Sequence, residues 1–130
     1  MNSDQPSQQL QGTTLSGFAP LDDVQELQII DVVEGTGPEV QPGATISAHY
    51  TGALCKNGTI FQSSHDMGRP ITFGLSQVIA GWTEGVPGMK VGGTRRLIIP
   101  AAKAYGANSP SPDIPANADL VFDIELVGIQ

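Results

Sequence analysis

The sequence contains very little of the chemistry that usually marks a redox or metal site. Its only cysteine, Cys55, has no second cysteine with which to form an internal disulfide. A reactive thiol needs a neighbouring base or cation, and the sequence places none beside Cys55. The two histidines, His49 and His65, lack a metal-ligand spacing. We therefore expect no disulfide, no metal, and an ordinary structural role for Cys55 at a strand end.

Long apolar runs and early basic residues are also missing. No stretch reaches membrane-spanning length, and no charged-then-apolar signal opens the chain. Residues 1–55 carry seven Asp or Glu and no Lys or Arg, and the whole chain has a net charge of −7. This distribution excludes a basic nucleic-acid-binding surface. We expect no nucleic-acid or membrane partner and a cytoplasmic location, with the periplasm or secretion as the alternative if an export signal was removed upstream of Met1.

The sequence shows no constellation for covalent catalysis. It has no nucleophile with a nearby base, no Gly-rich phosphate loop, and no paired carboxylates at helical spacing. An enzyme built from these residues must act by binding and desolvating its substrate. We therefore expect no cofactor.

Glycine and proline are abundant, at 16 and 10 of 130 residues, as in turn-rich sheet proteins. The length fits one domain. Residues 1–22 are rich in Gln, Ser and Thr without an apolar period, so we expect a flexible polar leader before a domain at 23–130. We expect removal of this leader to leave stability unchanged.

Alternating apolar residues predict strands over most of the domain, and Asn57-Gly58 predicts a tight hairpin turn. Three prolines mark a long loop at residues 108–119, before the last strand. The predicted strands cover residues 27–34, 44–54, 59–62, 71–73 and 94–99, and a closing segment that begins at residue 120.

One segment has helical spacing instead. Val78, Ile79, Trp82 and Val86 form one apolar stripe, which Ser76 would cap and Pro87-Gly88 would end, giving a helix of about ten residues. A lone helix must bury its apolar face against a sheet, so we expect an α+β fold with an antiparallel sheet. Most aromatic residues fall between sheet and helix. Phe73 is assigned to the core, and the others either fill it or line a pocket with Trp82 at its floor.

Six consecutive blocks of the sequence carry a resemblance to a known family. They are HYTG (49–52), GTIFQSS (58–64), QVIAGWTEGV (77–86), MKVGGTRRLIIP (89–100), AYGA (104–107) and IPANADLVFDIELV (114–127). In order and spacing, over about residues 27–129, these blocks resemble the FKBP-type peptidyl-prolyl cis–trans isomerases. The resemblance implies a twisted five- or six-stranded antiparallel sheet wrapped around one short helix.

The resemblance implies isomerisation of X–Pro bonds in polypeptides and a set of pocket residues. The family's Ile79 position donates a backbone N–H to the ligand carbonyl, and Tyr105 provides a hydroxyl. The implied catalytic residues are Tyr50, Phe61, Trp82, Tyr105 and Phe122, and the implied substrate-binding residues are Val78, Ile79, Ile114, Ile71 and Gln62. The implied partners are proline-containing polypeptides and rapamycin-like macrolides, and the expected state is a monomer.

The rim of the expected pocket departs from the family. Gln62 stands where the family commonly has aspartate, Met67 where it has arginine, and Ile71 where it has phenylalanine. The main alternative function is an FKBP-fold chaperone or binding module that holds proline-containing segments with little turnover. An unrelated adhesion or structural domain would leave the six blocks unexplained.

Overall fold

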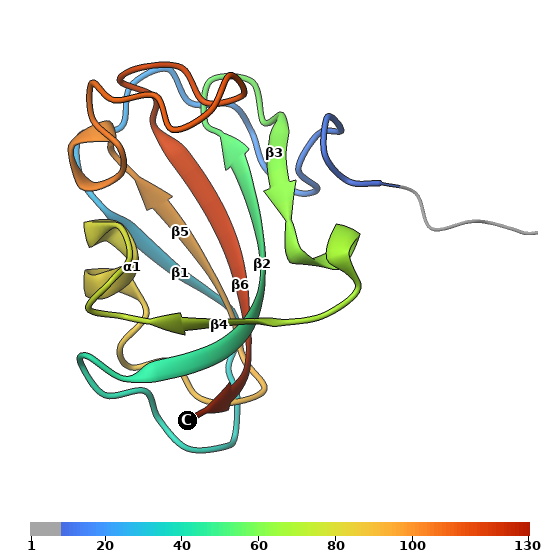
Figure 1. The fold of residues 1–130 in the computed structure, drawn as a ribbon, viewed down its shortest axis with the longest axis vertical. Helices are drawn as coiled ribbons and strands as arrows, with labels where there is room; N and C mark the ends of the chain where they lie inside the picture. Colours follow the sequence, from blue (N-terminus) through green and yellow to red (C-terminus); the bar gives the residue numbers. More distant parts are fainter. Residues whose placement is uncertain (1–8) are drawn as a thin grey trace, which may run out of the picture.

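The computed structural model describes residues 9–130, which form one sheet with a short helix against it (Figure 1). Two single turns of 3-10 helix, η1 (Ser64–Met67) and η2 (Ala101–Lys103), follow β3 and β5. The strands and the α-helix are β1 (Gln28–Val33), β2 (Thr45–Leu54), β3 (Ile60–Ser63), β4 (Ile71–Gly74), α1 (Ala80–Gly85), β5 (Thr94–Ile99) and β6 (Leu120–Ile129).

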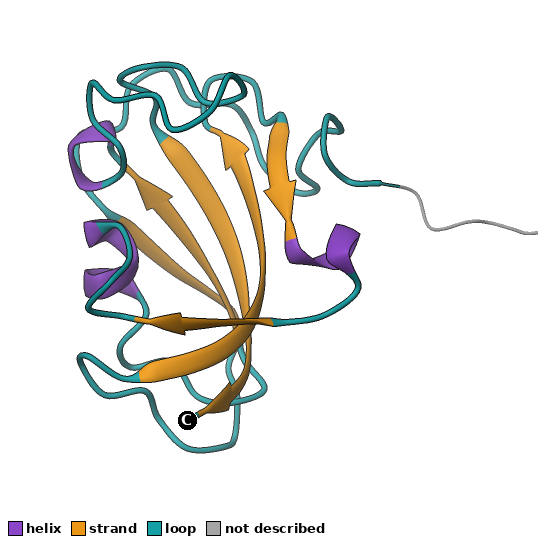
Figure 2. Cartoon of the chain, in the orientation of Figure 1, coloured by secondary structure: helices purple, strands orange, loops and turns teal. Residues whose placement is uncertain are grey.

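The six strands pair in the order β1-β5-β6-β2-β3, and β4 also pairs with β2. Every pairing is antiparallel. The predicted α+β fold, with a twisted antiparallel sheet around one short helix, is confirmed (Figure 2). Among residues 9–130, no helix combines the length and apolar character that crossing a membrane requires.

The strand β2 pairs with two different strands along one of its edges. Its first half, Thr45–Ala48, pairs with β4, and Thr51–Ala53 pairs with β3. The segment between β3 and β4 therefore swings away from the sheet through η1. Between the two paired parts of β2, the Tyr50 N–H donates to the Ser64 hydroxyl oxygen of η1 (2.8 Å), so η1 rather than a strand borders the middle of β2.

The predicted helix is wrong in its start and its length. Helix α1 has six residues and begins at Ala80, with Ile79 rather than Ser76 at the N-cap and no side chain capping it. The β-branched Val78 and Ile79 disfavour helix, and Gly81 and Gly85 add little propensity of their own. Ile79 is extended (φ −58°, ψ 150°), so Val78 and Ile79 lead into the helix instead of forming its first turn.

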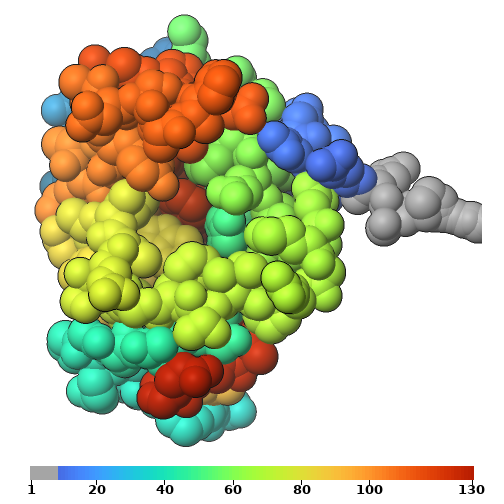
Figure 3. All heavy atoms as spheres, viewed as in Figure 1, coloured from blue at the N-terminus to red at the C-terminus, as the bar shows by residue number. Residues whose placement is uncertain are grey.

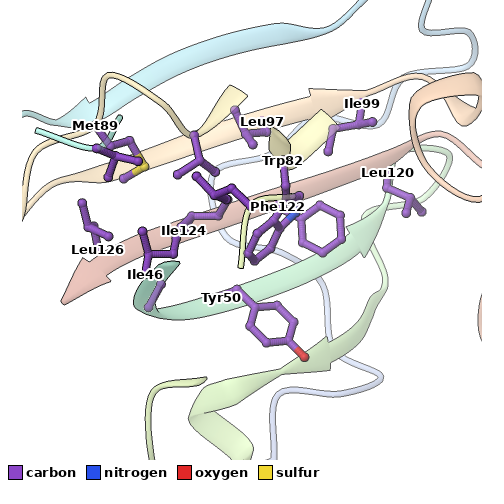
Figure 4. Packing of buried hydrophobic residues seen from close by; sticks show 14 of the residues in the cluster. Ile46, Tyr50, Trp82, Met89, Leu97, Ile99, Leu120, Phe122, Ile124 and Leu126 are labelled. Atoms are coloured by element: carbon purple, nitrogen blue, oxygen red, sulfur yellow. The ribbon is translucent and has the colours of Figure 1, made fainter. Parts of the chain in front are cut away.

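Helix α1 lies very close to β5 because two of its residues are glycines. A Cβ at Gly81 would lie 2.6 Å from the Ile99 side chain, and a Cβ at Gly85 would lie 2.7 Å from Leu97. Trp82 and Val86, from the predicted apolar stripe, are buried against the sheet as expected. Figure 4 shows this core, with Trp82 directed at Phe122 of β6.

A second apolar cluster includes the leader. Leu15 is 6% exposed and packs with residues of β2, β3, β5 and β6 and the turn after β2. Its buried members are Leu15, Val24, Ala53, Cys55, Ile60, Ile98 and Val121. Burial, and then the charge of Asp119, raise the pKa of the Cys55 thiol to about 12, which leaves it inert at neutral pH.

Backbone hydrogen bonds also fix the leader along β3. The Gly12 N–H donates to the Ile60 carbonyl oxygen (2.8 Å), and the Ile60 N–H donates to the Thr13 carbonyl oxygen (2.8 Å). The Leu15 N–H donates to the Gly58 carbonyl oxygen (2.8 Å). The expectation of a leader without packing contacts is therefore wrong for residues 9–22, while its first eight residues lie outside the described part. The domain boundary at residue 23 stays a prediction.

We expect Leu15→Ala to lower the free energy of unfolding by about 2 kcal/mol or more, because truncating a buried leucine leaves a cavity. Val127→Ala is the matched control, since Val127 is 49% exposed and its truncation removes little burial. Chemical denaturation of the three proteins measures both effects. Equal stability of Leu15→Ala and the parent protein would contradict the docked leader.

Candidate active site

An open cavity of about 550 Å³ lies over the middle of the sheet, beside α1. This volume is within the range of small-molecule and peptide pockets. Figure 3 shows the hollow between the yellow atoms of the helix region, the orange loop after β5 and the green β3 region, with red β6 atoms at its bottom. The lining residues are Tyr50, Phe61, Gln62, Phe73, Gln77, Val78, Ile79, Trp82, Tyr105 and Phe122.

Trp82 lies at the centre of the aromatic packing and forms the floor. Its ring is 5.4 Å from Phe122, 5.8 Å from Tyr50 and 4.8 Å from Phe73, measured between centroids. All three pairs are edge-to-face, the geometry that aromatic quadrupoles favour. Trp82 is only 4% exposed, so these contacts hold it in one position.

Gly52 makes room for two of the rings. It lies in β2 opposite Phe122 of β6 and opposite Gln62 of β3. A Cβ at this position would lie 2.7 Å from both the Phe122 ring and the Phe61 ring. These rings meet edge-on at 5.8 Å. A side chain at residue 52 would therefore displace one wall of the cavity.

Few polar groups face this apolar surface. The Ile79 carbonyl accepts hydrogen bonds from the N–H groups of Trp82 (3.0 Å) and Thr83 (3.2 Å), while the Ile79 N–H donates to no acceptor within residues 9–130. The Trp82 indole N–H is buried and also has no partner in the described chain. Burial, and then the nearby Tyr105, raise the pKa of the Tyr50 hydroxyl, so it stays neutral. Tyr105 is 36% exposed at the mouth.

The cavity brings together most of the residues that the sequence indicated. Two expected members do not line it: Ile71 is partly buried in β4, and Ile114, in the long loop, has its side chain buried in the core. Phe73, assigned to the core from sequence, lines the cavity, and so does Gln77. Phe73 follows Ile71 by two residues and shares its face of β4, but Ile71 does not line the cavity, so strand alternation alone does not identify Phe73 as a cavity residue.

Two of the rim positions that depart from the family are exposed. Gln62 is exposed, and Met67, at the end of η1, is 48% exposed. Neither lies in the half-buried setting that a structural ion pair would occupy. Residues 9–130 contain no group of three or more His, Cys, Asp or Glu side chains placed to hold a metal ion.

Comparison with known proteins identifies the family. The family model described as FKBP-type peptidyl-prolyl cis-trans isomerase matches residues 37–127, a range that includes α1, the strands β2 to β5 and most of β6, but not β1. The chain belongs to this family. Its activity is the cis–trans isomerisation of peptidyl-prolyl bonds.

Individual relatives agree with this assignment. The Peptidyl-prolyl cis-trans isomerase FPR2 of Saccharomyces cerevisiae is 48% identical over 71% of this FKBP-type chain and 70% of its own. An FK506-binding protein of Neisseria meningitidis serogroup B is 49% identical over 79% of this chain and 95% of its own.

A solved structure shares the fold. FkpA from Escherichia coli superposes with a TM-score of 0.73 and 39% identity, covering 80% of this chain. The chain spans about half of the FkpA structure, 48% of its length. The similarity therefore concerns only part of FkpA.

We expect Gly52→Ala to lower kcat/KM on X–Pro peptides by about 10- to 100-fold, because a displacement of about 1 Å in a site has effects of this size. Overpacking should also lower the free energy of unfolding by about 1–3 kcal/mol. Gly128→Ala, in β6, is the matched control, since a Cβ there meets nothing within 4 Å. Unchanged kinetics in Gly52→Ala would remove Phe61 and Phe122 from the site.

Proposed function

We propose that the aromatic cavity holds the proline ring of a polypeptide substrate on Trp82 and accelerates rotation about the preceding peptide bond. The observation that carries this proposal is an open apolar cavity whose floor is a fixed tryptophan surrounded by three aromatic rings. No covalent bond is made or broken in the reaction, which fits a site without a nucleophile.

The chemistry follows from the electronic change during rotation. The planar X–Pro amide is stabilised by resonance, and the barrier to rotation is about 18–20 kcal/mol. In the twisted state the conjugation is lost, and the carbonyl becomes ketone-like and less polar. An apolar cavity favours this state over the planar amide, which is better solvated by water. Each ~1.4 kcal/mol of such preference gives about a tenfold rate.

The proposed roles of individual residues follow from their places. The Ile79 N–H, which has no acceptor within residues 9–130, is free to donate to a substrate carbonyl. The Tyr105 hydroxyl, at the mouth, supplies a second hydrogen bond. Tyr50, Phe61 and Phe122 form the walls around the proline.

The substrates that we propose are flexible polypeptides containing X–Pro. The cavity also suits macrolides of the FK506 or rapamycin kind, a proposal supported by the FK506-binding names of the bacterial relatives. Other relatives are named as isomerases, which supports catalytic turnover over the alternative of a module that only binds proline-containing segments. The monomeric state and the cytoplasmic location stay predictions.

We expect Trp82→Leu to remain folded and to lower kcat/KM by about tenfold or more, because leucine fills part of the core but gives no flat floor for the proline. Its stability cost should be smaller than the about 3–5 kcal/mol of a buried Trp→Ala change. Val86→Ala is the control, because Val86 is buried on the same helix segment but does not line the cavity. A folded Trp82→Leu protein with full activity would place the reaction elsewhere.

We expect Tyr105→Phe to keep the fold and to lower kcat/KM by about 2- to 12-fold, the equivalent of one neutral hydrogen bond of about 0.5–1.5 kcal/mol. Isomerisation of a short X–Pro peptide and thermal unfolding, measured on the same preparation, separate activity from stability. Parental kinetics would show that this hydroxyl makes no contact in the transition state.

A further inference from the structure

A second cavity of about 330 Å³ lies beside the first and is built partly by the leader. Figure 3 shows the blue leader atoms beside the green β3 region and close to the orange loop after β5. The lining residues are Gln9, Gln11, Gly12, Thr59, Ile60, Phe61 and Asp113. The proposed reaction on the proline uses none of them except Phe61.

The leader is held at this cavity by contacts with three separate parts of the domain. Both carboxylate oxygens of Asp66 in η1 accept backbone hydrogen bonds, from the Leu10 N–H (2.7 Å) and the Gln11 N–H (3.0 Å). The Gly12 N–H donates to the Ile60 carbonyl oxygen in β3 (2.8 Å). The Gln11 side chain donates from Nε2 to Asp113 Oδ2 in the long loop (3.2 Å). These contacts give the cavity a defined wall.

Phe61 lines both cavities. It is 8% exposed and is held on one side by the Phe122 ring at 5.8 Å. An extended chain advances about 3.3–3.6 Å per residue, so residues two or three places from a bound proline lie about 7–11 Å away. That distance exceeds the width of one phenylalanine ring. A polypeptide with its proline on Trp82 therefore reaches the second cavity with a flanking residue.

The second cavity has the chemistry to hold a long cationic side chain. The only charged group in its lining is the exposed carboxylate of Asp113, and the other polar groups are the side chains of Gln9, Gln11 and Thr59. Ile60 and Phe61 offer apolar surface for the methylene groups of lysine or arginine, whose charged head then reaches the carboxylate. The net charge of the chain, −7, also favours the binding of a cationic side chain.

We propose that this second cavity is a substrate subsite that prefers lysine or arginine two or three residues from the isomerised proline. The inference rests on the proposed function, because it takes the proline to be on Trp82. It assigns the leader a part in substrate selection, through Gln9 and Gln11, in addition to its packing.

The test compares seven-residue peptides that share one X–Pro bond and differ only in a Lys or a Glu placed two or three residues from the proline, on either side. Exchange NMR measures kcat/KM for each peptide without a coupling protease. We expect the Lys peptide to be preferred by about two- to fivefold on one side of the proline, as for an exposed ion pair. The preference should shrink as salt is added.

Two variants separate the subsite from general electrostatics. Asp113→Asn should bring the ratio of Lys to Glu peptides close to one, and so should deletion of residues 1–11, which removes Gln9 and Gln11. Glu26→Gln removes one negative charge from an exposed position outside both cavities and should leave the ratio unchanged.

Equal rates for Lys and Glu peptides in the parent protein would overturn the inference. A preference that survives in Asp113→Asn, or that falls equally in Glu26→Gln, would also overturn it, because net charge alone would then explain the selectivity. Absence of turnover with every peptide is a distinct result: it would contradict the proposed function itself and, with it, this inference.

Discussion

The contact between Trp82 and Phe122 is the one on which the rest of the structure depends. It joins α1 to β6, a central strand of the sheet, and the rings of Tyr50 and Phe73 pack around the same indole. Gly81 and Gly85 let the helix come close enough to β5 for the contact to form. The residues that close the core are therefore also the residues that shape the cavity, so stability and activity share one set of side chains.

The position of the cavity follows from strand pairing. The strand β2 pairs with β4 along its first half and with β3 further on, and between these two parts the Tyr50 N–H donates to the Ser64 hydroxyl oxygen of η1 (2.8 Å). Aromatic side chains from four strands and the helix segment meet in the cavity. The site is thus a consequence of topology as much as of side-chain choice.

Most of the sheet could be predicted from local patterns. Alternation marks the strands, and a hairpin joins β2 and β3 at the expected place. Its loop is wider than the expected two-residue Asn-Gly turn: the Gly58 N–H is bonded to the Leu54 carbonyl oxygen (2.7 Å), and of Asn57 and Gly58 only Gly58 has a positive φ (74°). Alternation does not say how deeply a strand is buried: β1 is as apolar as the others, yet Ile29, Ile30, Val32 and Val33 are exposed because it lies at the sheet edge.

The other differences between the sequence predictions and the structure have physical causes that a sequence pattern does not show. The leader has scattered apolar residues without a period, and it docks as an extended segment through main-chain hydrogen bonds, which any sequence can make. The predicted helix is too long because Val78 and Ile79, which complete the apolar stripe, are β-branched and precede the helix instead of forming its first turn. Most pocket residues came from the family resemblance, since whether Phe73 or Ile114 faces the cavity depends on how distant segments meet.

The place of β6 in the sheet constrains the order in which the protein can fold. This last strand lies between β5 and β2 and is their shared neighbour, so neither has its central partner while translation is still before residue 120. Pairing of distant segments is slow, and strands that wait unpaired are prone to associate wrongly. A nascent chain that has already synthesised all the aromatic residues except Phe122 therefore still lacks a closed pocket. The pocket closes, and the catalyst of prolyl isomerisation becomes active, only when the ten residues of β6 have paired with the sheet.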